Sequence, residues 1–218
     1  MFAILSAMVI THHKGECFKV VSGDTTLVFG PASKESKNLK PVNFGADVAF
    51  VSLNHPDMNG AADAARGGRE PIVLEGPGEY EVGAMFATGL PSISLYDKVE
   101  SINTIYEVQF DNLTLVYLGA LGNAKLSSEV LEKIEDVDVL LTPIGGGGVL
   151  SPNEAHKLSA LLEARIVIPM HYEGMGDKGA LKMFLKEVGE GDIQPIDKLT
   201  IKQKDVADKN GEVIVLSA

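Results

Sequence analysis

The sequence predicts an α/β protein, and three observations support this class. The first half of the chain contains short β-rich runs separated by turn residues. The second half alternates apolar runs typical of buried strands with segments of helical spacing. No linker-like stretch interrupts the 218 residues, of which 45% are hydrophobic. We therefore expect one domain over residues 1–218, in which sheets are covered on their outer faces.

Strands dominate the first half. They are expected at residues 17–21, 25–29, 47–52 and 72–74. Turn chemistry separates them, as in the sequence SGD at residues 22–24. A tight bend follows at the sequence GPG of residues 76–78, and residues 104–119 predict a hairpin that turns at Asp111 and Asn112.

Helices enter in the second half. Helical spacing covers residues 127–133, 151–162 and 179–188, and buried strands are expected at residues 137–144 and 164–170. The helix at residues 151–162 has clear N-terminal capping signals. Ser151 can cap it, Pro152 suits the first helical position, and Glu154 completes a capping box. A final polar hairpin is expected to turn near Asn210 and Gly211.

Charge and cysteine content exclude several classes of protein. The net charge of −11 argues against nucleic acid or an anionic membrane as a partner, because both require clustered Lys and Arg. Cys17 is the only cysteine, so no intrachain disulfide can form, which is consistent with the cytoplasm. The apolar residues 1–10 lack the basic start and the cleavage site of a signal peptide.

Five histidines are the first candidates for chemistry. His12 and His13 fall in a probable first strand, where alternation directs their side chains to opposite faces. His156 lies in the predicted helix 151–162 and reads as a surface residue. His55 and His171 each follow a strongly apolar strand, which is where α/β folds place functional groups.

Five segments stand out along the chain: VITHHKGECFKV, GADVAFVSLNHPDMNG, LTLVYLGALG, DVLLTPIGGGGVLSPNEA and ARIVIPMHYEG. In their order and spacing they resemble the metallo-β-lactamase-fold superfamily. The chain is most similar to the branch of small metal-dependent hydrolases that includes L-ascorbate-6-phosphate lactonase. The resemblance implies a four-layer αββα sandwich with its site at the lip between two sheets.

The metal motif departs from the family pattern. The family motif H-x-H-x-D-H falls on Leu53, His55, Asp57 and Met58. A later stretch that resembles H-x-G-D has Tyr117 and Ala120 at the histidine and aspartate positions. Residues 82–98 contain no middle histidine, and a Gly-His-Ser near the N-terminus is replaced by Lys14, Gly15 and Glu16. Of the family's ligands, His55, Asp57 and His171 remain.

The remaining ligands are too few for the zinc pair that the family uses. In the family pattern His55 belongs to one metal, while Asp57 and His171 belong to the other. Neither centre keeps the three protein ligands that catalytic zinc normally needs. Leu53 offers no lone pair, and the thioether of Met58 suits copper(I) better than zinc. A dinuclear zinc site is therefore not expected; the cofactor is either none or a single divalent ion (Zn, Mn or Fe).

Three functions stay open at this point. The chain could bind a ligand or a partner without metal chemistry. It could be a mononuclear hydrolase of a lactone, ester or phosphoester, with His55, Asp57 and His171 around one ion. It could also be a metal-free enzyme that uses Tyr117, Glu16 or Glu79 as acid or base. Asp57 and Tyr117 are the candidate catalytic residues.

Two further segments have both a functional and a structural interpretation. In EGPGEYEVG, Glu79 and Tyr80 could reach the site, although a glycine-rich turn explains the segment as well. Residues 145–148 are four glycines just before the capped helix, which suits an anionic small-molecule ligand or a mobile loop. The resemblance also suggests a homo-oligomer.

Overall fold

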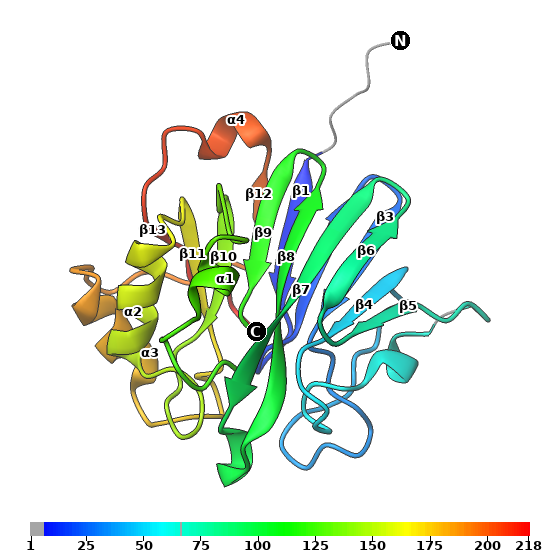
Figure 1. The fold of residues 1–218 in the computed structure, drawn as a ribbon, viewed down its shortest axis with the longest axis horizontal. Helices are drawn as coiled ribbons and strands as arrows, with labels where there is room; N and C mark the ends of the chain where they lie inside the picture. Colours follow the sequence, from blue (N-terminus) through cyan, green and yellow to red (C-terminus); the bar gives the residue numbers. More distant parts are fainter. Residues whose placement is uncertain (1–6, 66) are drawn as a thin grey trace.

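The first of two β-sheets is built mainly from the N-terminal part of the chain (Figure 1). The computed structural model describes residues 7–65 and 67–218. The strands, in sheet order, are β12 (Leu199–Ile201), β1 (Met8–His12), β2 (Phe18–Ser22), β3 (Thr25–Phe29), β4 (Val48–Val51) and β5 (Ile72–Glu75). From β12 to β3 the strands pair antiparallel, whereas β3, β4 and β5 are parallel.

The second sheet is also mixed. Its strands, in sheet order, are β13 (Glu212–Val213), β11 (Ile166–Met170), β10 (Val139–Pro143), β9 (Leu113–Tyr117), β8 (Ser101–Phe110), β7 (Met85–Ser94) and β6 (Gly78–Val82). The strands from β6 to β9 form an antiparallel meander. The strands from β9 to β13 are parallel.

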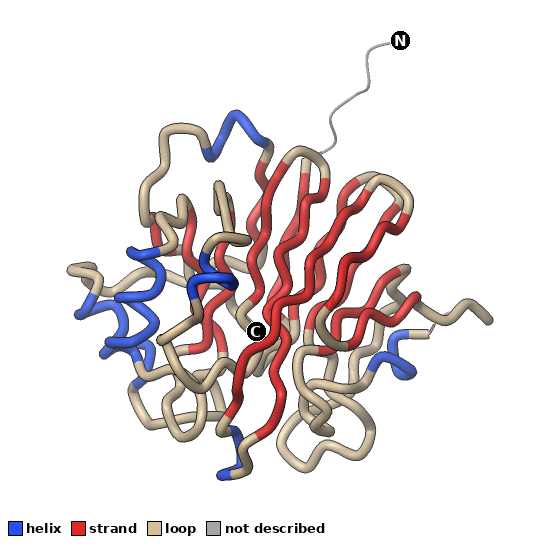
Figure 2. The backbone as a smooth tube through the Cα atoms, viewed as in Figure 1, coloured by secondary structure: helices blue, strands red, loops and turns tan. Residues whose placement is uncertain are grey.

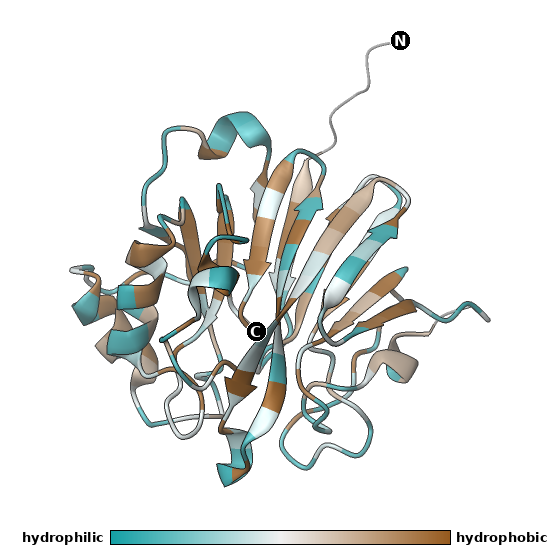
Figure 3. Cartoon of the chain, in the orientation of Figure 1, coloured by the Kyte–Doolittle hydropathy of each residue, from teal (hydrophilic) through white to brown (hydrophobic). Residues whose placement is uncertain are grey.

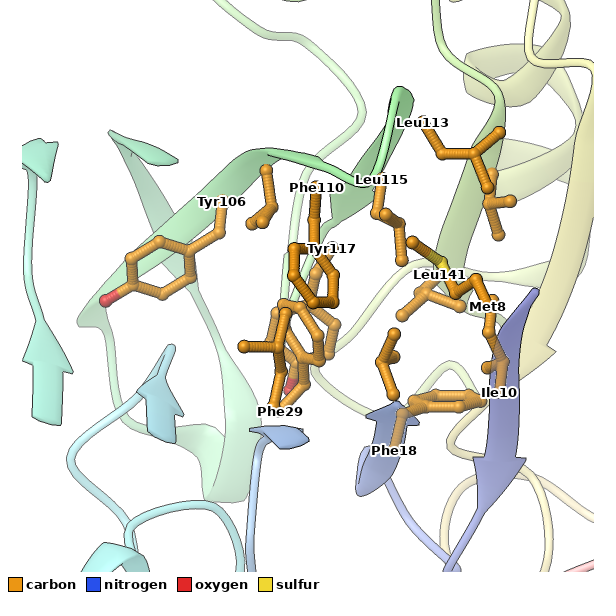
Figure 4. Close-up of a cluster of buried hydrophobic side chains, with 14 of the residues drawn as sticks. Met8, Ile10, Phe18, Phe29, Tyr106, Phe110, Leu113, Leu115, Tyr117 and Leu141 are labelled. Carbon is orange, nitrogen blue, oxygen red and sulfur yellow. The ribbon is translucent and has the colours of Figure 1, made fainter. Parts of the chain in front are cut away.

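The main core lies between the two sheets (Figure 4). Alternating residues of β2 and β3, such as Phe18 and Phe29, meet Leu115 and Tyr117 from β9 in this layer. The rings of Phe29 and Phe50 stack with centroids 4.4 Å apart. Each such large apolar side chain contributes roughly 1.5–3 kcal/mol by leaving water. Figure 3 shows the corresponding hydrophobic colour along the strands.

The outer faces of the sheets are covered differently. Three helices pack on the second sheet: α1 (Ser128–Leu131), α2 (Pro152–Leu161) and α3 (Ala180–Glu187). The outer face of the first sheet packs against the short 3-10 helix η1 (Ala61–Ala64) and a loop that contains Phe44. The predicted α/β class and two-sheet sandwich are therefore present, with a thinner outer layer on the first sheet.

Two local signals form as predicted. In α2 the Ser151 backbone N–H donates to Glu154 Oε2 at 2.9 Å, and the Ser151 side chain accepts from the Glu154 N–H. Between β8 and β9, Asp111 and Asn112 have φ values of 51° and 60°. Two left-handed residues in succession make the primed turn that matches the twist of a hairpin.

The predicted C-terminal hairpin is wrong. Gly211 does adopt a left-handed turn conformation, with φ of 69°. However, β12 pairs with β1 of the first sheet, while β13 pairs with β11 of the second, and the short helix α4 (Gln203–Val206) lies between them. Each strand satisfies a different sheet edge, so tertiary pairing overrides the local turn signal.

One end of the sandwich collects the loops that follow several strands. β4, β10 and β11 each run parallel to a neighbouring strand, so their carboxyl ends point to the same edge of their sheet. Figure 1 shows the loops after β3 and β4 and the β7–β8 hairpin tip at the lower edge of the molecule. In the described part of the chain, no helix has the length and apolarity to cross a bilayer.

Candidate functional site

The loop after β4 brings His55 and Asp57 together, as the sequence predicted. Asp57 is only 1% exposed, whereas His55 is half-buried. The Asp57 backbone N–H donates to His55 Nδ1 at 3.2 Å, and the same nitrogen lies 3.7 Å from Asp57 Oδ2. Because Nδ1 accepts this hydrogen bond, the neutral ring carries its proton on Nε2. The outer nitrogen of His55 is thus a donor.

Protein donors surround the carboxylate of Asp57. Hydrogen bonds come from Ser36 Oγ at 2.5 Å, Asn38 Nδ2 at 2.8 Å and the Tyr96 hydroxyl at 2.7 Å. Burial raises the pKa of Asp57, but these three bonds and the adjacent His55 outweigh it and hold the pKa below its ordinary value. Asp57 is therefore an ionised acceptor whose two oxygens are both already engaged.

Tyr96 links the two predicted histidines. It lies in the 3-10 turn η2 (Tyr96–Lys98) at the tip of the β7–β8 hairpin. Its ring centroid is 4.9 Å from that of His55 and 5.2 Å from that of His171, with both pairs edge-to-face. Burial and the neighbouring Asp57 raise the pKa of Tyr96, so its hydroxyl stays a donor. One tyrosine thus contacts all three predicted metal ligands.

The third predicted ligand, His171, follows β11 and belongs to a buried polar group. Its Nδ1 lies 2.8 Å from Glu16 Oε1, and the Tyr117 hydroxyl donates to Glu16 Oε2 at 3.3 Å. All three side chains are at most 1% exposed. A Cβ on Gly30 would lie 2.3 Å from the Tyr117 hydroxyl, so only glycine fits there. The structure thus pairs Glu16 with Tyr117, two candidates that the sequence could not connect.

An apolar cluster adjoins these polar groups. It consists of Leu53, Met58, Ala120, Val149 and Met175, with Leu39 and Tyr96 packed against it. Leu53, Met58 and Ala120 stand at positions where the family resemblance expects metal ligands. Here their side chains pack on one another and leave no polar donor to share with His55 or Asp57.

The residues present do not fit a metal ion in this arrangement. Both oxygens of Asp57 accept protein hydrogen bonds, and the ring of Tyr96 packs against both imidazoles. Within residues 7–65 and 67–218, no group of three or more His, Cys, Asp or Glu side chains is placed to hold one. Whether His55, Asp57 and His171 coordinate a metal stays a prediction that would need Tyr96 to move.

Glu79 and Tyr80 have a structural setting. Glu79 is exposed on β6, where it pairs in register with Thr88. The Tyr80 hydroxyl donates to the carbonyl oxygen of Gly76 at 2.8 Å and so closes the preceding turn. The glycine-rich turn explains this segment well.

The other histidines have contacts and elements of their own. His12 is buried at the end of β1, with Nε2 3.2 Å from the Gly15 carbonyl oxygen and its ring stacked on Phe18. His13 follows β1 and is exposed, instead of lying within the strand as expected. His156 lies on α2.

The four glycines at residues 145–148 allow close packing beside the site. A Cβ on Gly145 would lie 2.1 Å from the carbonyl oxygen of His171, and one on Gly148 would lie 2.4 Å from that of Leu95. The loop therefore presses against the segments that carry His171 and Tyr96. Anion binding by this loop stays a prediction.

Sequence reasoning missed Tyr96, Ser36 and Asn38. Tyr96 does lie in residues 82–98, the segment in which the family pattern places a middle histidine, and a tyrosine at that place is a signal for a site residue. Ser36 and Asn38 lie in a polar loop, SKESKN, that has no pattern of its own. Their role emerges only when the fold places this loop over Asp57.

Comparisons with known proteins agree with this fold. Residues 9–171 match the family model described as "Beta-lactamase superfamily domain". The chain is 27% identical over 193 residues to a UPF0173 metal-dependent hydrolase of Thermococcus kodakarensis, covering 76% of this chain and 85% of the relative. A Listeria monocytogenes protein of the same name is 21% identical over 194 residues, with the same coverage.

Solved structures show the same architecture. A Thermotoga maritima protein, described as a zinc-dependent hydrolase candidate of the metallo-β-lactamase superfamily, superposes with a TM-score of 0.71 at 24% identity, covering 96% of this chain and 98% of that one. Bacillus subtilis YhfI, a metallo-β-lactamase fold protein, gives 0.63 at 14% identity, with 98% and 97% covered. The two mixed sheets with flanking helices are thus the metallo-β-lactamase fold, and the chain belongs to the β-lactamase superfamily domain family.

Proposed function

We propose that this chain keeps the metallo-β-lactamase fold but works by binding a ligand or a partner, without a dinuclear zinc centre. The observation that supports this most is that both carboxylate oxygens of Asp57 already accept hydrogen bonds, from Ser36, Asn38 and Tyr96. A metal ion would have to compete with these donors for the same two oxygens.

The apolar cluster supports the same proposal. Leu53, Met58 and Ala120 replace, by the family resemblance, three positions that would carry ligands, and they form a buried contact group. Restoring one polar ligand would place it among apolar side chains, where an unpaired polar group is unfavourable. The degenerate motif is therefore consistent with a site in which apolar packing has replaced metal ligands.

A mononuclear hydrolase is the second candidate. It is favoured by the similarity to proteins named metal-dependent hydrolases and by the proximity of His55 to Asp57. On this proposal His55, Asp57 and His171 hold one divalent ion once Tyr96 withdraws, and the substrate is a lactone, an ester or a phosphoester. A closer kinship to L-ascorbate-6-phosphate lactonase would favour the lactone.

Metal-free acid–base catalysis by Glu16 or Tyr117 has less support. The two groups do contact each other, but neither is exposed to solvent. Burial also raises the pKa of Tyr117 well above its ordinary value, which makes the phenol a poor base precursor near neutral pH. We assign this pair a structural role.

Metal analysis separates the first two candidates. We would measure metal content by elemental mass spectrometry on protein purified without chelator, together with the His171→Ala and His55→Ala variants. Much less than one metal per chain in all three proteins is expected. About one metal per chain, lost in both variants, would replace the proposal by the mononuclear hydrolase and justify a screen of lactones and phosphoesters.

Other properties of the protein are proposed on sequence grounds. We expect a cytoplasmic protein that binds a small molecule and forms a homo-oligomer. We do not expect nucleic acid or membranes as partners. Light scattering coupled to size-exclusion chromatography tests the oligomer directly. A mass equal to one chain of 23.2 kDa would contradict it.

A further inference from the structure

The side chain of Tyr96 fills a space bounded by groups from other segments. We call this space the Tyr96 niche and define it by Asp57, His55 and His171. Asp57 accepts the hydroxyl hydrogen bond, while the two imidazoles contact the ring. The niche thus binds the two halves of a phenol separately, one by hydrogen bonding and the other by aromatic contact.

The walls of the niche are held in place by bonds that do not involve Tyr96. Ser36 and Asn38 also donate to Asp57. At the His171 wall, Glu16 binds the His171 side chain, and the Gly15 carbonyl oxygen accepts the His171 backbone N–H at 2.9 Å. The binding groups would therefore keep their positions if Tyr96 left, which is the condition for a preformed ligand site.

One wall of the niche faces solvent. The His55 side chain is 27% exposed and lines a surface cavity of about 390 Å³ together with Asn54 and Asn59. Tyr96 itself is half-buried. The niche therefore reaches solvent at His55 and at the exposed part of Tyr96.

Tyr96 sits at a hairpin tip, outside the paired strands. Strand β7 ends at Ser94 and strand β8 begins at Ser101. The tip between them is the short helical turn at the lower edge of Figure 2. Asp97 and Lys98 have φ values of 56° and 62°, a strained region for residues other than glycine. Rotation of the Tyr96 side chain out of the niche would therefore leave the strand pairing unchanged.

We infer that the Tyr96 niche is a ligand site for a small planar ring compound with a neutral hydroxyl group, such as a phenol, which takes the place of the Tyr96 side chain. This inference rests on the proposed function, because it names the class of ligand for the same site. The hydroxyl would donate to Asp57, and the ring would pack against the two imidazoles. A neutral group is favoured there, since an anion would be repelled by the carboxylate.

The test uses the Tyr96→Ala variant and two probes of similar shape, p-cresol and toluene. Binding is measured by calorimetry and by the rise in the thermal unfolding midpoint. We expect p-cresol to bind about tenfold more tightly than toluene, because a hydrogen bond to a charged group contributes on the order of 1.5 kcal/mol. The Tyr96→Ala/Asp57→Asn double variant should reduce that ratio several-fold.

Tyr80→Ala is the matched control. It removes the same side chain from a half-buried position whose hydroxyl binds a backbone carbonyl oxygen. This variant should bind p-cresol no more tightly than toluene. Equal affinity of the two probes for Tyr96→Ala, or no binding of either, would overturn the inference.

A measurement on the wild-type chain applies even if Tyr96→Ala does not fold. Excess p-cresol should shift the imidazole NMR signals of His55 and His171 and leave that of His156 in place; unchanged signals would overturn the inference. Metal content of the same sample keeps the two proposals apart. A metal-free protein that ignores p-cresol defeats only the ligand class, whereas one metal per chain defeats the proposed function.

Discussion

Two carboxylate–histidine pairs adjoin Tyr96, and they differ in distance, burial and hydrogen-bond partners. Glu16 and His171 approach to 2.8 Å, and both side chains are at most 1% exposed. Asp57 and His55 are 3.7 Å apart, and the His55 side chain is 27% exposed. The first pair is closed on itself, while Asp57 takes its hydrogen bonds mainly from neutral donors.

This difference separates the contacts that stabilise the site from the groups that are available to bind a ligand. In the buried pair each partner depends on the other, because a lone buried charge is strongly unfavourable. Asp57 is equally buried, but three neutral donors share its carboxylate, so it depends less on any one contact. We therefore assign stability mainly to the Glu16–His171 side of Tyr96 and the ligand hydrogen bond to the Asp57 side.

The largest expected effect comes from His171→Ala. The change leaves the Glu16 carboxyl group buried, with only the Tyr117 hydroxyl as a partner. We expect the free energy of unfolding to fall by about 3–5 kcal/mol. Urea denaturation followed by circular dichroism measures it. A loss below about 1 kcal/mol would mean that the closed pair contributes no more than a surface contact.

The next effect concerns His12, which shares the Gly15 carbonyl oxygen with the His171 backbone. Burial is the main cause that lowers the pKa of His12 from 6.5 to about 4, and its Nδ1 has no hydrogen-bond partner in the described structure. Between pH 6.5 and 4 the unfolded chain binds the proton and the folded chain does not. Stability therefore falls as the pH falls through this window, by at most about 3 kcal/mol.

Comparison with His12→Phe isolates this contribution. Phenylalanine keeps an aromatic ring stacked near Phe18 but cannot bind a proton. Its free energy of unfolding, measured from pH 7 to pH 4, should decline less steeply than that of the wild type. Parallel curves would show that other groups cause the acid sensitivity.

A smaller effect is expected for Tyr96→Phe. The ring contacts with both histidines remain, but Asp57 loses one of its three side-chain donors. A hydrogen bond to a charged, buried group suggests a loss of about 1–2 kcal/mol. Because the removed bond lowers the pKa of Asp57, that pKa should rise, which carboxyl NMR during a pH titration can follow. An unchanged pKa would contradict the assigned bond.

The smallest effect is expected for His55→Ala. The partly exposed imidazole contributes one hydrogen bond from the Asp57 backbone N–H and one edge-to-face ring contact. The free energy of unfolding should change by less than about 1 kcal/mol. If His55→Ala destabilised the protein as much as His171→Ala, the division into a stabilising side and a binding side would be wrong.

Local and order-based features were predictable from the sequence. The capping box of α2 and the primed turn at Asp111 depend on neighbours within a few residues, so their side chains alone specify them. The positions of His55 and His171 at strand ends were also correct, because the apolar runs before them are long and regular. The fold itself was predictable from the order of five segments, each of which is only a weak match to the family pattern.

Contacts between distant segments were not predictable. Glu16 and His171 are 155 residues apart, and Asp57 and Tyr96 are 39 apart, so no spacing rule connects them. Tyr96 also has an ordinary sequence context at a hairpin tip. The prediction of a C-terminal hairpin was wrong for a related reason. Pairing of β12 with β1 and of β13 with β11, at the edges of two different sheets, competes with the local turn at Asn210.

The edge-to-face setting of Tyr96 gives the protein an optical signal of its own. The chain has no tryptophan and five tyrosines, so near-ultraviolet absorption and emission come mainly from phenol rings. Tyr106 and Tyr117 are locked in the core, whereas Tyr96 is bonded to a carboxylate near the surface. Release of that phenol into water would change its spectrum, and the motion of a single side chain becomes visible without any label.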